Sequence, residues 1–133
     1  MHTFTTEIPV RGYELDSLGH VNNAVYMHYL EIARWDLAKK CLGSVDYFKK
    51  LGMGLVVARV EMDYREPCFL DDHLIVKTQI TELTKRILEL HHVIYKRDTD
   101  KIVAEAKISA VPIELSTGKS TVFPLEALEK LKA

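Results

Sequence analysis

The chain has 133 residues, 47% of them hydrophobic and 28% charged, and its 18 basic and 19 acidic side chains leave a formal net charge of -1. This balance disfavours nucleic-acid binding, which needs a basic surface, and no apolar run reaches the roughly 18 residues of a membrane span. Cys41 and Cys68 are too few for a disulfide framework and lack metal-ligand spacing, and the first residues do not resemble a signal peptide. We therefore expect one cytoplasmic domain over residues 1–133, with a single core and little room for a deep cavity.

The first predicted element is a strand over residues 3 to 11, where apolar residues alternate. One face of this strand would carry Phe4, Thr6, Ile8 and Val10. Pro9 cannot donate a ladder hydrogen bond, which favours an edge or irregular strand. Residues 12 to 22 show no period, and their Asp, Ser, Gly and Asn residues predict a loop.

A long helix is predicted from residue 23 to about residue 42, because apolar residues recur there at intervals of three and four. This stripe consists of Tyr26, Tyr29, Leu30, Ala33, Leu37, Ala38 and Cys41. Asn22 or Asn23 is suited to cap the start of the helix, and Gly43 is suited to the left-handed conformation at its end.

Four further strands are predicted over residues 54–66, 73–82, 86–97 and 102–115, and a short helix begins at Leu125. In the first of these strands one face would carry Val56, Ala58, Val60, Met62 and Tyr64. Short links between the other three predict consecutive antiparallel neighbours. The small residues of segment 104–110 would let a helix lie close to the sheet.

One long apolar helix and about five antiparallel strands predict an α+β fold in which the sheet wraps the helix. The remaining edges and outer face of such a sheet would have to be covered by association with other chains.

The loop before the long helix carries the richest set of functional groups. Asp16, His20, Asn22 and Asn23 lie within eight residues and lead directly into a helix N-terminus, whose first N–H groups favour negative charge. Such N–H groups can stabilise an oxyanion, and a carboxylate nearby can act as general base or nucleophile. Asp-x-x-Gly followed by Asn is also an ordinary turn and cap, so spacing alone leaves both interpretations open.

The same residues resemble the signature of hotdog-fold acyl thioesterases of the 4-hydroxybenzoyl-CoA thioesterase type. The resemblance rests on Asp16-x-x-Gly19-His20-Val21-Asn22-Asn23-x-x-Tyr26, on Tyr29-x-Glu31-x-Ala33-Arg34, on Met62-Asp63-Tyr64-Arg65-Glu66-Pro67 and on Leu70-Asp71-Asp72. It covers nearly the whole chain, and the order of elements agrees with it. The implied fold is a long central helix wrapped by a curved antiparallel sheet.

The resemblance also implies roles for individual residues. Asp16 corresponds to the catalytic carboxylate, His20 would orient water or that carboxylate, and the N–H of Asn23 would polarise the thioester carbonyl. Gly19 would lie where the loop passes the thioester. Asn22 and Tyr26 are further substrate-binding candidates, although Tyr26 also fits plain core packing. Leu18 occupies a position where some relatives carry Asn, which argues against an Asn-assisted scheme.

The resemblance further implies a homodimer or homotetramer with active sites between subunits, acting on an acyl-CoA or an acyl-carrier-protein thioester. No cofactor is expected beyond the coenzyme A of the substrate, and no metal, because His28 and Glu31 on a single helix supply too few ligands. His91 and His92 should point to opposite faces of their strand.

Some candidates stay open at this level. The pairs Lys85-Arg86 and Lys96-Arg97 are candidates for coenzyme A phosphates, although solvated strand ends are more common. A hotdog-fold enoyl-CoA hydratase and a non-catalytic acyl-CoA-binding module are alternatives to the thioesterase.

Overall fold

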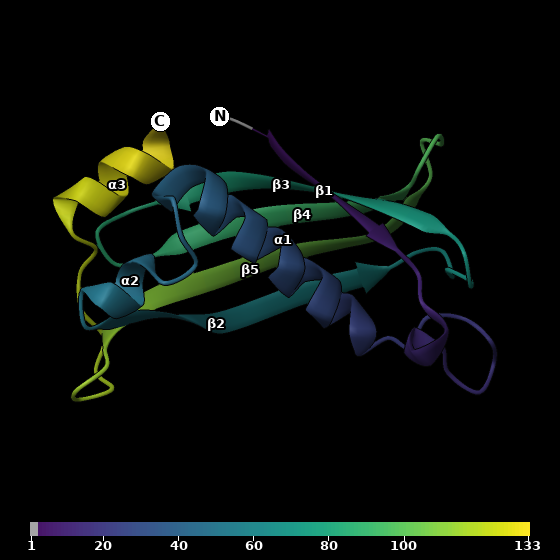
Figure 1. The fold of residues 1–133 in the computed structure, drawn as a ribbon, viewed down its shortest axis with the longest axis horizontal. Coiled ribbons are helices and arrows are strands. Elements are labelled where there is room, and N and C mark those ends of the chain that lie inside the picture. Colours follow the sequence, from purple (N-terminus) through teal and green to yellow (C-terminus); the bar gives the residue numbers. More distant parts are fainter. Residues whose placement is uncertain (1–2) are drawn as a thin grey trace.

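The structure, a computed structural model, describes residues 3–133, and Figure 1 shows α1 lying diagonally across one face of a single antiparallel sheet. The strand order in the sheet is β1-β3-β4-β5-β2. In chain order the elements are β1 (Thr3–Pro9), the 3-10 turn η1 (Gly12–Glu14), α1 (Val25–Leu42), α2 (Tyr47–Lys50), β2 (Met53–Tyr64), β3 (His73–Leu83), β4 (Leu88–Lys96), β5 (Ile102–Glu114) and α3 (Leu125–Lys132). This is the hotdog fold, and the predicted α+β class and five strands are confirmed.

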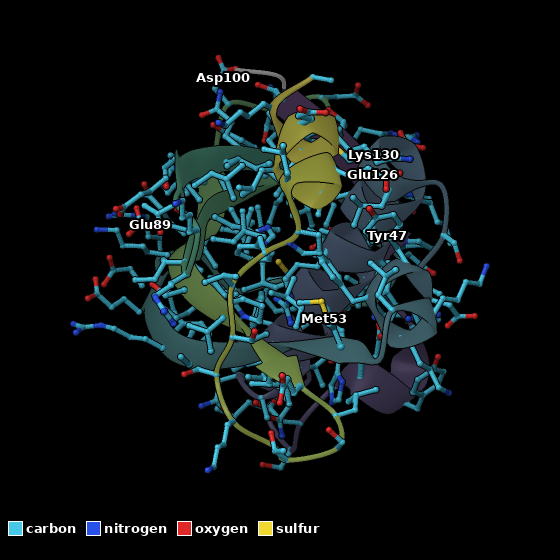
Figure 2. All side chains as sticks on the ribbon, turned by 90° about the vertical axis from the view of Figure 1, so that its left-hand side faces the viewer. Tyr47, Met53, Glu89, Asp100, Glu126 and Lys130 are labelled. Atoms are coloured by element: carbon cyan, nitrogen blue, oxygen red, sulfur yellow. The ribbon has the colours of Figure 1, made fainter. Side chains whose placement is uncertain are left out.

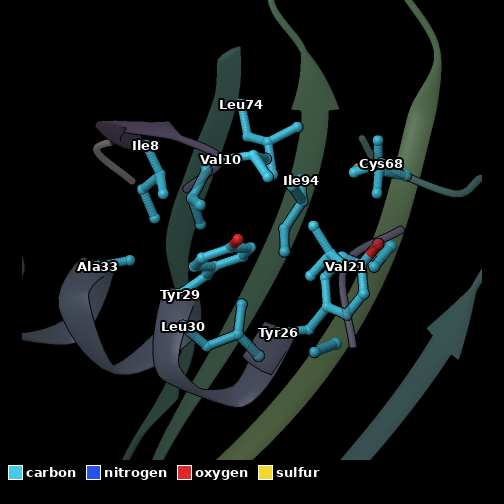
Figure 3. Close-up of a cluster of buried hydrophobic side chains, with 14 of the residues drawn as sticks. Ile8, Val10, Val21, Tyr26, Tyr29, Leu30, Ala33, Cys68, Leu74 and Ile94 are labelled. Carbon is cyan, nitrogen blue, oxygen red and sulfur yellow. The ribbon is translucent and has the colours of Figure 1, made fainter. Parts of the chain in front are cut away.

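The core lies between α1 and the sheet. Tyr29, Leu30 and Ala33 of α1 are fully buried, and Figure 3 shows them with Tyr26 among side chains from the neighbouring strands. On β5 the buried residues of one face are Ala104, Ala106, Ile108 and Ala110. Among the strands, α1 lies nearest to β1 and β3, so the close approach expected at segment 104–110 stays a prediction.

The helix begins two residues later than predicted. Its N-cap residue is Ala24, with no side-chain cap, whereas Asn22 Oδ1 accepts the N–H of Ala24 at 2.9 Å. The Asn22 side chain therefore closes a turn ahead of the helix and is not its N-cap. Gly43 ends the helix at φ 84°, and its N–H donates to the carbonyl of Lys39, as expected for a left-handed stop.

The prediction that Val56 and Ala58 share one face of β2 with Val60, Met62 and Tyr64 is wrong for the N-terminal half of the strand. Val57 pairs with Ala110 and Val60 pairs with Ile108, so the register shifts by one residue at Ala58. A β-bulge of this kind reverses which residues face the core. Val56 therefore faces the outer side of the sheet, whereas the alternation places it with Val60 on the helix side.

The sequence did not predict α2, because four residues are too few to show a helical period. α2 and α3 lie at the same end of the molecule, where Figure 2 shows Tyr47 beside Glu126 and Lys130. The Lys130 ammonium lies 5.5 Å from the Tyr47 ring centroid. Together with the end of α1, these helices cover a second buried cluster that includes Phe48, Phe123 and Leu131.

No helix within residues 3–133 combines the length and apolarity that crossing a membrane would require.

Candidate active site

The loop between η1 and α1 folds back on itself as a short hairpin. Leu15 and Val21 form an antiparallel bridge, and the N–H of Asp16 donates to the carbonyl of His20 at 2.9 Å. At its tip the Gly19 N–H donates to the Asp16 carbonyl at 3.0 Å, with Gly19 at φ 82°. A left-handed residue at this place explains the glycine. The turn interpretation of the Asp-x-x-Gly pattern is thus confirmed, and the turn holds Asp16 and His20 side by side.

The Asp16 carboxylate has one oxygen engaged locally and one directed at an imidazole. Oδ1 accepts the N–H of Leu18 at 2.9 Å, and Oδ2 lies 3.3 Å from His20 Nδ1. The two side chains are 25% and 33% exposed. The His20 ring packs edge-on against Phe69, with centroids 6.3 Å apart. The carboxylate is therefore fixed in orientation and still reachable from solvent.

The backbone on both sides of Asn23 is anchored by hydrogen bonds. The Asn22 carbonyl accepts the N–H of Val25 at 2.9 Å, and the N–H of Ala24 is bound by Asn22 Oδ1. The Asn23 carbonyl accepts the hydroxyl of Tyr64 at 2.9 Å. Within residues 3–133, the Asn23 N–H itself donates to no backbone or side-chain acceptor. This leaves one oriented donor beside the start of α1, where the helix dipole favours negative charge.

These groups face a common cleft of about 350 Å³. The cleft is lined by Asp16, His20, Val21, Asn23, Tyr26, Tyr64, Arg65, Glu66 and Pro67. Four of the six predicted site residues thus come together, while Gly19 and Asn22 shape the loop and do not line the cleft. Sequence reasoning did not include the β2 end among the site residues. The Tyr64-x-x-Pro67 segment was the available signal.

Glu14 ties the loop to the long helix. The Glu14 side chain is buried, its Oε1 accepts the Arg11 N–H at 2.7 Å and the Tyr29 hydroxyl at 2.8 Å, and its carbonyl accepts the Asn22 N–H. Burial by itself would raise the pKa of this carboxyl, but the hydrogen bonds from Arg11 and Tyr29 outweigh it and hold the pKa below its usual range. The carboxylate therefore stabilises the folded state at neutral pH.

We expect Glu14→Gln to destabilise the protein by about 2 kcal/mol at pH 7, because it replaces charge-assisted hydrogen bonds with weaker ones. A lowered folded-state pKa contributes stability above the unfolded value, which is lost as pH falls through the folded value. The difference in Tm between wild type and variant should therefore shrink below about pH 4. Thermal unfolding followed by circular dichroism at pH 7 and pH 3 measures this, and a difference that does not shrink in acid would contradict it.

The other candidate residues lie outside the cleft. His91 and His92 point to opposite faces as predicted: His91 Nε2 lies 2.8 Å from Glu105, whereas His92 is fully buried, bonds Thr78 at 2.8 Å, and burial lowers its pKa to about 3. No group of three or more His, Cys, Asp or Glu residues in the described part of the chain is arranged to hold a metal ion.

A second hollow lies at the other end of the helix, between α1, α2 and the first residues of β2. It has a volume of about 330 Å³. Its apolar wall includes Trp35, Leu37, Ala38, Leu42, Val45, Phe48, Met53, Leu55 and Val57. We call it the apolar groove. The chain thus carries two open hollows, one toward each end of α1.

Comparisons with known proteins agree with this geometry. The model of the thioesterase-like superfamily matches residues 10–131. The chain is 37% identical over 127 residues to the long-chain acyl-CoA thioesterase FadM of Escherichia coli, covering 96% of each protein. It is 31% identical to the chloroplastic acyl-acyl carrier protein thioesterase ATL3 of Arabidopsis thaliana, covering 79% of this chain and 55% of that protein.

Among solved structures, the probable thioesterase YbaW of Escherichia coli superposes with a TM-score of 0.83 at 36% identity, covering 97% of this chain and 96% of that one. A family model that spans most of the chain, a relative of equal length above one third identity, and a shared hotdog fold all lead to the same assignment. This chain belongs to the thioesterase-like superfamily.

Proposed function

We propose that this protein hydrolyses acyl-CoA thioesters to the free acid and coenzyme A. The observation that carries the proposal is the pairing, across one cleft, of the Asp16 carboxylate with the unengaged N–H of Asn23 at the start of α1. Similarity to FadM supports the reaction class.

In the proposed mechanism the thioester carbonyl oxygen accepts the Asn23 N–H. Because the Asn22 carbonyl of the same peptide is itself hydrogen-bonded, this N–H is a better donor than an isolated amide. Asp16 removes a proton from water as the water oxygen attacks the carbonyl carbon, and negative charge collects on the carbonyl oxygen. Collapse breaks the carbon–sulfur bond, and the departing thiolate takes the proton from Asp16.

His20 would orient the Asp16 carboxylate or the attacking water through its contact with Oδ2. A direct attack by Asp16, giving an anhydride that water then hydrolyses, uses the same groups. No cofactor is needed in either route beyond the coenzyme A of the substrate.

We propose that the active form is a homodimer joined along β2. This strand lies at an edge of the sheet, and its apolar side chains are exposed by 37% to 50%. They are Leu55, Val56, Val57, Val60 and Tyr64. Exposed apolar edge strands are templates for pairing. The outer face of the sheet instead carries ion pairs such as Arg65–Glu105 and Lys107–Glu89, which favours a dimer over stacking into a tetramer.

The dimer would complete the site. Two copies related by a two-fold axis pair β2 antiparallel, so the Tyr64 end of one strand lies beside the Met53 end of the other. The cleft of one copy then adjoins the apolar groove of its partner. We propose that this groove takes a long acyl chain, in keeping with the similarity to FadM, and that the protein works in the cytoplasm.

An acyl-carrier-protein thioester is the second candidate substrate, favoured by the similarity to ATL3. It would use the same cleft and the same two groups on the protein.

The test is release of free thiol from butyryl-, octanoyl-, lauroyl-, palmitoyl- and benzoyl-CoA and from palmitoyl-acyl carrier protein. We expect kcat/KM to rise roughly a hundredfold from butyryl- to palmitoyl-CoA, because each buried methylene is worth about 0.8 kcal/mol and only part of the chain is enclosed. Faster turnover of the carrier-protein substrate would assign the second candidate. Binding of acyl-CoA by calorimetry with no thiol release would refute hydrolysis and indicate a binding module, and hydration of an enoyl-CoA would indicate the hydratase.

A further inference from the structure

Three tyrosines form a continuous chain between the two halves of the site. Tyr64, at the end of β2, packs edge-on against Tyr26 with ring centroids 5.4 Å apart. Tyr26 packs edge-on against Tyr29 at 5.8 Å. The chain ends in a hydrogen bond at each side: the Tyr64 hydroxyl donates to the Asn23 carbonyl, and the Tyr29 hydroxyl donates to Glu14.

The two inner tyrosines of this row of rings are buried. Tyr29 is fully buried and Tyr26 is 4% exposed, and Figure 3 shows both rings rising from α1 into the core. Burial, and then the neighbouring Glu14, raise the pKa of Tyr29 above its usual value, so its hydroxyl remains a donor throughout the neutral range. Edge-to-face aromatic contacts favour specific ring geometry, so these contacts set how the three rings lie relative to one another.

We propose that Tyr64, Tyr26 and Tyr29 act as a brace in which Tyr64 positions the Asn23 N–H and Tyr29, through Glu14, positions the loop that carries Asp16. The inference rests on the proposed function, since it assigns positioning residues to that site. In this proposal the hydroxyls of Tyr64 and Tyr29 do not touch the reacting atoms.

Tyr64 acts on the Asn23–Ala24 peptide. Its N–H is bound by Asn22 Oδ1 and its carbonyl by Tyr64, so this peptide plane is fixed at both ends. Loss of the Tyr64 bond would leave one end free, and the preceding Asn23 N–H would then be oriented only by the bond between the Asn22 carbonyl and the Val25 N–H. Small displacements of an oriented donor are costly because transition-state stabilisation depends on geometry.

Tyr29 acts on the loop that carries Asp16. Glu14 accepts the Tyr29 hydroxyl with its side chain and the Asn22 N–H with its carbonyl. Glu14 and Asn22, which flank the Asp16 hairpin, are therefore hydrogen-bonded to each other, and Glu14 anchors them to Tyr29 of α1. Removing the Tyr29 hydroxyl would loosen the base side of the site and leave the Asn23–Tyr64 contact in place.

The test compares Tyr64→Phe and Tyr29→Phe, which keep the rings and delete only the hydroxyls. The matched control is Tyr47→Phe at the opposite end of the molecule, where the buried hydroxyl has no partner in the described chain. We expect each brace variant to lower kcat on palmitoyl-CoA roughly tenfold to a hundredfold, with KM within about twofold and Tyr47→Phe unchanged.

Two unreactive coenzyme A analogues separate the two sides of the brace. A ketone analogue, in which a methylene replaces the thioester sulfur, keeps the carbonyl, whereas an alkyl thioether lacks it. We expect Tyr64→Phe to weaken binding of the ketone by at least about fivefold, the equivalent of one hydrogen bond, and to leave the thioether unaffected. Tyr29→Phe should change neither affinity.

The outcomes are distinguishable. If the wild type is active and both variants keep its kcat, the brace is overturned. Equal weakening of ketone and thioether binding in Tyr64→Phe would also overturn it, because a general structural defect does not select for a carbonyl. Failure of the wild type to release thiol from any acyl-CoA would instead overturn the proposed function. Tyr64 is 50% exposed, so Tyr64→Phe is expected to fold. If Tyr29→Phe does not fold, Glu14→Gln weakens the same hydrogen bond from the other side and must show the same loss of kcat.

Discussion

Replacing Asp16 by Asn is expected to lower kcat on acyl-CoA substrates by about a thousandfold, since general-base catalysis typically contributes 10²–10⁴. Asn keeps the side-chain oxygen that accepts the Leu18 N–H, so the turn that carries the residue should survive. The variant loses the charge that takes a proton from water and the contact between carboxylate and His20. KM should change little, because the carboxylate acts on water and is not a binding group in this mechanism.

The measurement is steady-state thiol release, with Asp100→Asn as the matched control. Asp100 is an exposed residue in the turn between β4 and β5, and its replacement removes the same charge away from both the cleft and β2. Glu66→Gln is the informative second variant, because Glu66 is the other carboxylate that lines the cleft. Turnover by Asp16→Asn at the wild-type rate, or a larger loss in Glu66→Gln, would refute the role assigned to Asp16.

Placing a charge on the exposed edge strand is expected to abolish activity by separating the subunits. In Val60→Glu two like charges would meet near the two-fold axis of the proposed dimer, and charged residues are the usual means of preventing edge pairing. Val60 is 37% exposed in the single chain, so the monomer itself should tolerate the change. We expect a monomer whose kcat/KM on palmitoyl-CoA is reduced more than about a hundredfold, because each cleft loses its neighbouring groove.

Light scattering coupled to size-exclusion chromatography gives the mass, and the thiol assay gives the activity. Leu125→Glu is the control, since it places the same charge at another exposed apolar side chain, on α3. If Val60→Glu does not fold, dilution of the wild type while following specific activity tests the same point. A monomer that retains full activity would refute the composite site.

The loop motif shows how far sequence reasoning reaches. Residue order alone placed Asp16, His20 and Asn23 before a helix, because turn chemistry and helix ends are written in local sequence. The resemblance implied roles for His20 and the Asn23 N–H, but the contact between Asp16 and His20 and the unengaged Asn23 N–H depend on backbone hydrogen bonds among residues 14 to 25, which no residue pattern contains. For the same reason Asn22, expected as a helix cap, instead closes a turn ahead of a helix that begins two residues later.

The contribution of β2 to the site depended on pairing between distant strands. Tyr64 lies 41 residues from Asn23 in the chain, and no local pattern reveals that their atoms meet. The bulge at Ala58, which reverses the faces of β2, is set by the register with β5. Residues 55 to 58 are all apolar, so the sequence fits either register and only the paired strands reveal the bulge.

By itself the sequence determined the α+β class, the long helix, the consecutive strands and the loop that carries the candidate catalytic groups, because periodicity and turn residues act over a few neighbouring positions. The hotdog fold was implied by the resemblance of the loop motif. Tertiary structure alone decided which strand became the exposed edge, where the cleft and the apolar groove lie, and how three tyrosines from β2 and α1 connect Asn23 to Glu14. Those features arise from contacts between residues far apart in the chain, whose energies depend on packing and on no single segment.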